Sequence, residues 1–117
     1  MTIHFYPGIT DLKNVKVILN RFDDSNEVLI NDELLDPALS LRIINHSPTG
    51  FEWGYGGGGP AQLALAILLK FFPVEMALIL YQDFKEEVVA TWERDAVNLM
   101  LYVDIRKWAM LKIHSKK

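Results

Sequence analysis

The glycines of this chain are gathered in one short segment, and that segment constrains the fold more than any other feature. Six of the seven glycines lie between Gly50 and Gly59, directly before Pro60 and a long apolar run. Glycine permits close backbone approaches that other residues resist, and proline is favoured in the first turn of a helix. The pattern predicts a loop that leads into a helix N-terminus, with Gly59 as the cap.

The residues after the glycines predict two consecutive helices. Segment 61–72, AQLALAILLKFF, is apolar on nearly every side, so we expect a central buried helix that Pro73 ends. Gln62 lies where a capping-box partner would reach back to the helix start. A second, amphipathic helix is expected from about Val74 to Thr91. Its predicted apolar stripe consists of Val74, Leu78, Tyr81, Phe84 or Lys85, and Val88.

The first half of the chain predicts strands, because short apolar runs alternate with polar residues and are separated by turn residues. A polar cluster at Asp23, Asp24, Ser25 and Asn26 predicts one turn, and Asn31-Asp32 predicts a second. The expected extended segments are His4–Tyr6 at an edge, Val15–Phe22, Glu27–Leu35, the alternating Leu39, Leu41 and Ile43, and the alternating Phe51, Trp53 and Tyr55.

The last third fits two interpretations. Val97, Leu101, Ile105 and Trp108 could share one helix face, whereas 99–103 is equally a buried strand followed by a helix that Asp104 caps. We favour the strand and short helix. The expected fold is a single α+β domain over residues 1–117, with an N-terminal antiparallel sheet packed on the central apolar helix and its amphipathic partner.

The amino-acid composition and the pattern of the N-terminal residues exclude several classes of protein. The absence of cysteine excludes a disulfide scaffold, a thiol nucleophile and a cysteine-ligated zinc site. The N-terminus lacks the basic flank and apolar core of a signal peptide. Segment 60–81 is long and apolar, but Lys70, Pro73 and Glu75 interrupt it, so we expect no membrane insertion and a cytoplasmic location.

A net charge of −3 argues against a general nucleic-acid binder. Positive charge nevertheless collects at the C-terminal end, which leaves nucleic acid as a minor alternative. The residues concerned are Arg106, Lys107, Lys112, Lys116 and Lys117. His4, His46 and His114 are too far apart in sequence for a local metal motif, so we expect no metal and no cofactor.

The glycine segment is the main candidate site, and its glycines allow three alternative interpretations. Its N–H groups could converge with the helix dipole on a phosphate, nucleotide or carboxylate. The glycines could instead allow a tight crossing beneath Trp53 and Tyr55, or the loop could display these aromatics to a partner. The candidate ligand-binding residues are Trp53, Gly54, Tyr55, Gly56, Gly57, Gly58, Gly59, Ala61, Gln62, Gln82 and Asp83.

Known phosphate-loop patterns fit this segment poorly. The Walker spacing fails, and GxGxxG can only be forced onto Gly54, Gly56 and Gly59 without a following ribose-binding acid. His46 and Glu52 flank the loop and could act as acid and base on a bound ligand. Gln82 and Asp83 could instead satisfy loop N–H groups. We assign no catalytic residue and favour a protein that is not an enzyme.

The segment GFEWGYGGGGPAQLALAIL, followed by YQDFKEEVVA and by Ile105 and Trp108, resembles a family of small uncharacterised proteins from bacteria, archaea and mobile elements. The family motif usually reads GYGGSGPA, and Gly58 replaces its serine, so serine chemistry is not expected here. The resemblance covers about residues 47–90 and implies no activity.

We therefore expect a small binding or interaction module that presents Trp53 and Tyr55. Its partner is expected to be a protein rather than nucleic acid, and a homodimer remains open. A role as inhibitor or adaptor in host–phage conflict is suggested by analogy with mobile-element proteins. The alternative is a nucleotide- or phosphate-binding protein that uses the glycine loop.

Overall fold

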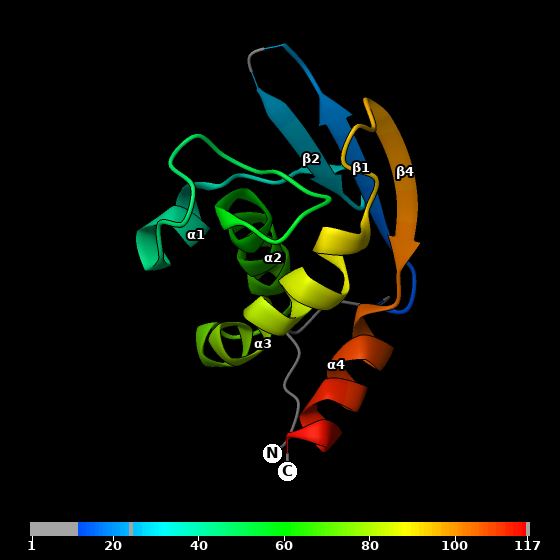
Figure 1. Cartoon of the computed structure of the whole chain (residues 1–117). Helices are drawn as coiled ribbons and strands as arrows, with labels where there is room; N and C mark the ends of the chain where they lie inside the picture. Colours follow the sequence, from blue (N-terminus) through cyan, green and yellow to red (C-terminus); the bar gives the residue numbers. More distant parts are fainter. Residues whose placement is uncertain (1–11, 24, 117) are drawn as a thin grey trace.

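A computed structural model describes residues 12–23 and 25–116. Its α+β fold has a four-stranded antiparallel sheet in the order β3-β2-β1-β4, with the helices gathered on one face (Figure 1). The expected α+β fold is confirmed, whereas the expected strand His4–Tyr6, Asp24 of the first turn and Lys117 lie outside the described residues. The elements are β1 (Val15–Arg21), β2 (Asn26–Ile30), β3 (Glu33–Leu34), α1 (Ala38–Ile43), α2 (Gly58–Phe71), α3 (Val74–Glu87), a 3-10 turn (Val89–Thr91), β4 (Asn98–Val103) and α4 (Ile105–Ser115).

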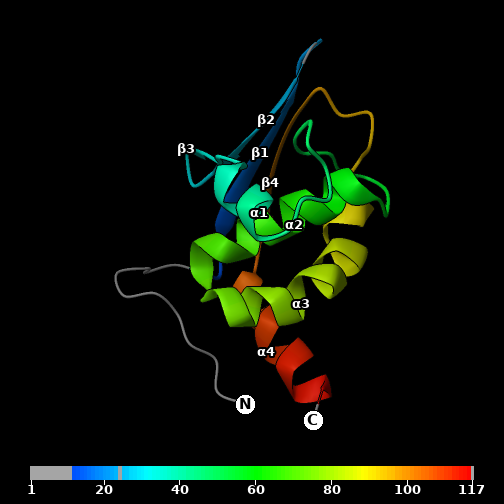
Figure 2. The same cartoon turned by 90° about the vertical axis from the view of Figure 1, so that its left-hand side faces the viewer.

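Helix α2 forms the centre of the core, as expected from its uniformly apolar sequence. The sheet contributes the alternating buried side chains of β1 and β2, such as Val17 and Ile30, and α3 packs on another side of α2. Figure 2 shows α1 and α2 in front of the sheet with α3 beneath them. Along residues 12–23 and 25–116, no helix combines the length and apolarity that crossing a bilayer requires.

The two predicted turns of the first hairpins are confirmed. The Phe22 N–H donates to the Ser25 carbonyl oxygen at 2.9 Å, which closes the β1–β2 connection. Asn31 and Asp32 both have positive φ, 51° and 69°, as a tight two-residue hairpin turn requires. Their types suit it, because Asn and Asp tolerate the left-handed region better than most residues.

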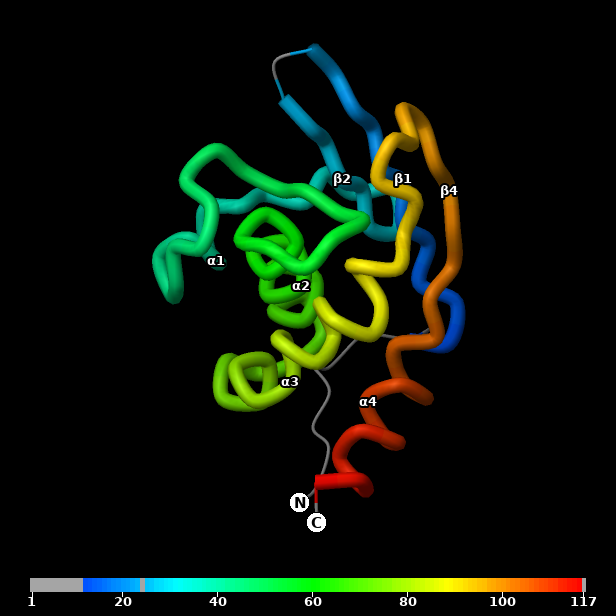
Figure 3. The backbone as a smooth tube through the Cα atoms, in the orientation of Figure 1, coloured from blue at the N-terminus to red at the C-terminus, as the bar shows by residue number. Residues whose placement is uncertain are grey.

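The C-terminal segment is a strand followed by a helix, and Asp104 caps that helix by accepting from the Lys107 N–H at 2.8 Å. This confirms the favoured interpretation over a single helix. The tube in Figure 3 shows α4 leaving the lower end of β4 and turning back toward α3. The Trp108 ring packs edge-on against Phe84 of α3, with ring centroids 4.9 Å apart.

Two predicted strands are wrong. Leu39, Leu41 and Ile43 belong to helix α1, because Asp36 accepts from the Ala38 N–H at 2.9 Å and Pro37 precedes the first helical residue. The segment with Phe51 and Trp53 is extended but joins no strand. Its Phe51 carbonyl oxygen accepts from the Asn26 side chain, and the positive φ of Gly54, 84°, turns the chain away.

The helix boundaries also differ from expectation. Helix α2 begins at Gly58 with Gly57 as N-cap, so Pro60 lies inside the first turn, where its missing N–H removes no intrahelical bond. Helix α3 ends at Glu87, and the 3-10 turn replaces its predicted last turn. The expected stripe of α3 is confirmed at Tyr81 and Phe84, which are buried, but it is wrong at Val74 and Leu78, which are partly exposed. The buried face is Met76, Ala77, Leu80, Tyr81 and Phe84.

Candidate functional site

The glycine loop is packed closely against its neighbours. A Cβ on Gly54 would lie 2.4 Å from the Arg94 Cα, and one on Gly58 would lie 2.4 Å from the His46 carbonyl oxygen. Both distances are shorter than a real Cβ contact, and a larger residue at either place would force the backbone apart. Close packing, one of the three alternatives for these glycines, therefore accounts for Gly54 and Gly58, but not for Gly56, whose added Cβ would have no atom nearer than 3.8 Å.

The first turn of α2 is covered on more than one side. A Cβ on Gly59 would lie 2.5 Å from the Glu52 Cβ, and the His46 carbonyl oxygen lies beside Gly58. The Ala61 N–H already donates to the Gly57 carbonyl oxygen at 3.0 Å. A carbonyl oxygen and a carboxylate side chain beside this turn make it a poor approach for a second anion.

Gln62 fastens the preceding loop to α2. Its amide is fully buried; its oxygen accepts from the N–H groups of His46 and Ser47 at 2.7 and 3.1 Å. Its nitrogen donates to the Ser40 hydroxyl and the Ile44 carbonyl oxygen at 2.9 and 3.0 Å. The predicted capping role is wrong, because no side chain caps α2. These four bonds fill the amide's hydrogen-bonding capacity.

Tyr81 joins the loop to α3, and its hydroxyl is bonded as a buried tyrosine requires. The hydroxyl lies 2.8 Å from His46 Nε2, and the exposed Gln82 donates to it at 3.2 Å. Asp83 points elsewhere, since its carboxylate pairs with Lys116 at 2.8 Å. That hydrogen bond holds the pKa of Asp83 below its usual range. The expectation that Asp83 reaches the glycine loop is therefore wrong.

Trp53 is buried under Arg21 instead of being displayed. The guanidinium lies 4.4 Å from the ring centroid and donates to both Glu52 carboxylate oxygens at 2.9 and 3.0 Å. The same guanidinium donates to the Arg94 carbonyl oxygen at 2.7 Å. Since Trp53 is fully buried, the prediction that its ring presents a contact surface is wrong.

Tyr55, Glu52 and His46 of the loop each contact a different partner. Tyr55 is half-buried beneath the Arg94 guanidinium, 4.4 Å from its ring centroid. Glu52 pairs with Arg21, and His46 bonds to Tyr81, so each of the two predicted acid–base partners is engaged by a different residue. Within residues 12–23 and 25–116, no three potential metal-ligating side chains gather closely enough to hold an ion.

The solvent face of the sheet carries a row of apolar side chains that the sequence analysis missed. The strand register places Leu34, Leu29, Ile18 and Met100 side by side across all four strands. Leu34 and Met100 are 61% and 56% exposed. The signal was present in the sequence, because apolar residues occupy positions that alternation assigns to solvent in successive strands.

The C-terminal basic residues are not one continuous cluster. Lys112 forms an ion pair with Glu87, and Lys116 forms one with Asp83, so α3 neutralises both. The contact with Glu87 raises the pKa of Lys112. This arrangement weakens the nucleic-acid alternative, because only Arg106 and Lys107 remain outside such pairs among the four that the structure describes.

Comparison with known protein families gives one match. The family described as "Family of unknown function (DUF6166)" matches residues 20–111. No curated protein and no solved structure matches the chain. The match covers most of the chain, and the protein therefore belongs to this family of unknown function.

Proposed function

We propose that the protein is a small non-enzymatic binding module that contacts a second protein chain through the solvent face of its sheet. The observation that carries this proposal is the apolar row Leu34, Leu29, Ile18 and Met100, aligned by the strand register. Contiguous apolar surface on a folded domain marks an interaction site more often than scattered single residues do. The row replaces the glycine loop as the contact surface.

The partner that best fits the solvent face of the sheet is a second copy of the chain. The row is uncharged and flanked by Lys16, which pairs with Asp32 at 2.6 Å, toward one end of the strands and by Glu27 toward the other. A twofold axis along the row would superpose apolar on apolar and bring each Lys16 toward the Glu27 of the other copy. Such an isologous contact is the commonest way for identical chains to pair.

The expected dimer is weak. The row takes one side chain from each of four strands about 4.8 Å apart, and same-face positions recur about every 6.8 Å along a strand, so the row covers roughly 130 Å² of flat area per copy. A standard interface buries about 800 Å² per partner, so association in the micromolar to millimolar range is expected. A weak module of this kind suits an adaptor or inhibitor, the role suggested by the resemblance to mobile-element proteins.

The alternative, nucleotide or phosphate binding at the start of α2, receives less support. Close packing against Arg94, His46 and Glu52 accounts for three of the loop's glycines. Gln62, which would have faced the ligand, has all of its hydrogen-bonding capacity occupied by the protein.

Sedimentation velocity at increasing concentrations tests the proposed function. The natural chain should shift from monomer to dimer, and Met100→Lys should remain monomeric, since a twofold axis along the row would bring the two introduced lysines together at the β4 end of the contact. Met110→Lys is the matched control, because Met110 is an exposed methionine of α4, away from the sheet. A natural chain that stays monomeric up to about 1 mM, or a Met100→Lys variant that dimerises normally, overturns the proposal.

A further inference from the structure

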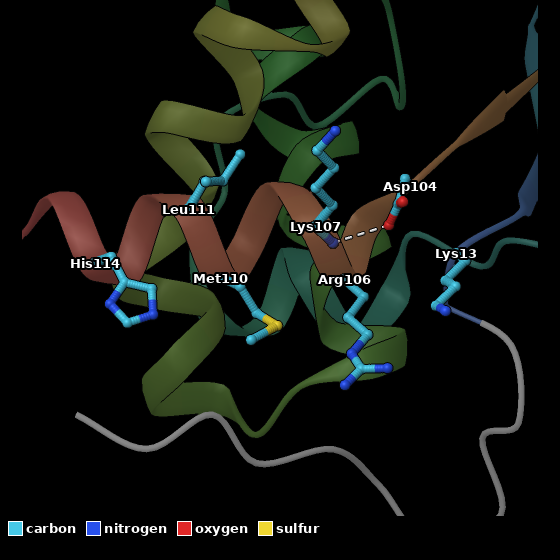
Figure 4. A pocket seen from close by; sticks show the side chains of 7 residues that line it. All are labelled: Lys13, Asp104, Arg106, Lys107, Met110, Leu111 and His114. Carbon is cyan, nitrogen blue, oxygen red and sulfur yellow. Dashed lines mark hydrogen bonds between the residues drawn. The ribbon is translucent and has the colours of Figure 1, made fainter.

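Helix α4 has an outward face that differs from the one packed against the protein. Its inward residues Ile105, Ala109 and Ile113 are buried. Its outward residues combine positive charge with apolar surface, since Met110 and Leu111 are 40% and 61% exposed. Figure 4 shows Arg106, Met110 and His114 projecting on one side of the helix and Lys107 and Leu111 on the other. These five side chains are all at the surface.

A shallow hollow of about 520 Å³ follows this face. Lys13 and Asp104 line its end near the start of α4, next to Arg106 and Lys107, whereas Met110, Leu111 and His114 line the rest. The end with Lys13 and Asp104 is thus the cationic end, and the remainder is largely aliphatic.

Two cations of the hollow, Arg106 and Lys107, have no carboxylate partner among the described residues. Asp104 is the one carboxylate among the hollow's described lining residues, and it accepts from the Lys107 backbone N–H as the helix cap. This positive surface stands out on a protein whose net charge is −3.

From this combination we infer that the α4 hollow binds an acidic, amphipathic peptide segment of another protein. Carboxylates of the segment pair with Arg106 and Lys107, and an apolar side chain lies against Met110 and Leu111. Such a segment matches both ends of the hollow. Its carboxylates would orient it and speed its association with the cationic end. Burial of its apolar side chains at the aliphatic end would provide affinity. A nucleic-acid backbone would match only the cationic end, since it offers no apolar group for the aliphatic end.

This inference is independent of the proposed dimer. The hollow and the apolar row of the sheet share no residue, so either surface can be disabled without touching the other. A monomeric natural chain would leave peptide binding intact, and loss of peptide binding would leave the dimer intact.

Fluorescence anisotropy with a labelled peptide of alternating glutamate and leucine tests the inference on the full chain. We expect saturable binding to the natural chain. Arg106→Glu should weaken the affinity about tenfold. Leu111→Ser, which changes an exposed residue and leaves the net charge the same, should weaken it severalfold. Lys70→Glu is the matched charge control, because Lys70 pairs with Glu33 on another part of the surface. It should change the affinity little.

Three outcomes would overturn the inference. Equal weakening by Lys70→Glu would mean that the peptide responds only to overall charge. Equal binding of a glutamate–serine peptide would remove the role of Met110 and Leu111. Tighter binding of a single-stranded oligonucleotide of the same charge, with a steep salt dependence, would assign the hollow to nucleic acid instead.

Discussion

Replacing Gln62 by leucine tests whether one buried amide holds residues 44–47 against α2. Leucine keeps a comparable volume but has no polar atom, so all four hydrogen bonds of the amide are lost. Three groups are left without a partner: the N–H groups of His46 and Ser47 and the Ile44 carbonyl oxygen. The Ser40 hydroxyl keeps its own bond, since it donates to the Pro37 carbonyl oxygen at 2.9 Å.

The expected loss follows from counting these groups. Each unsatisfied group costs about 1 kcal/mol here, the low end of the range, because the backbone of His46 and Ser47 is only half-buried. The greater apolar burial of leucine offsets about 1 kcal/mol. The net decrease in the free energy of unfolding is therefore about 2 kcal/mol, or roughly 8 °C in Tm for a domain of this size.

Urea unfolding followed by far-ultraviolet circular dichroism measures this difference. Gln82→Leu is the matched control, because Gln82 is exposed and its amide donates to the Tyr81 hydroxyl over a long distance of 3.2 Å. That change should stay within about 0.5 kcal/mol. Equal effects of the two substitutions would refute the role assigned to the Gln62 amide.

Two further predictions concern the glycine loop and the C-terminal ion pair. Gly54→Ala should lower the free energy of unfolding by roughly 2–4 kcal/mol, because Gly54 has a φ of 84° and its added methyl would lie 2.4 Å from the Arg94 Cα. Gly56→Ala, where the nearest atom is 3.8 Å away, should be neutral or stabilising by about 0.5 kcal/mol in the same urea unfolding experiment. Lys116 lowers the folded-state pKa of Asp83, so the stability from this pair is present above the unfolded pKa and is lost as the pH falls through the folded pKa. Asp83→Asn should therefore lose at most about 1 kcal/mol at neutral pH and match the natural chain in strong acid, as pH-dependent unfolding would show; a constant difference across pH would contradict this.

Long hydrophobic patterns were enough to predict most of the fold. Three features could be predicted from residues that are close together in the sequence. They are the apolar helix α2, the first two strands and the cap at Asp104. Helix α1 was missed because its six residues are too short to distinguish helical from alternating periodicity, and its start depends on Asp36.

The contacts of the candidate site were harder to predict because they join distant parts of the chain. Gln62 looked like a local cap, but its partners lie 15 to 22 residues earlier and depend on how that loop folds back. Trp53 looked like an interface residue, but Arg21 from β1 covers it. Only the apolar row could have been predicted from the sequence, and only after the register of the strands was known.

The pairing of β1 with β4 sets the order in which a newly made chain can complete its sheet. Val15 aligns with Val103, so the inner strand β1 keeps one unprotected edge until nearly the whole described sequence has been synthesised. Contacts between such distant residues slow folding, and an open strand edge invites pairing with other chains. Fragments that end before residue 98 should consequently associate with other chains more readily than fragments that include β4.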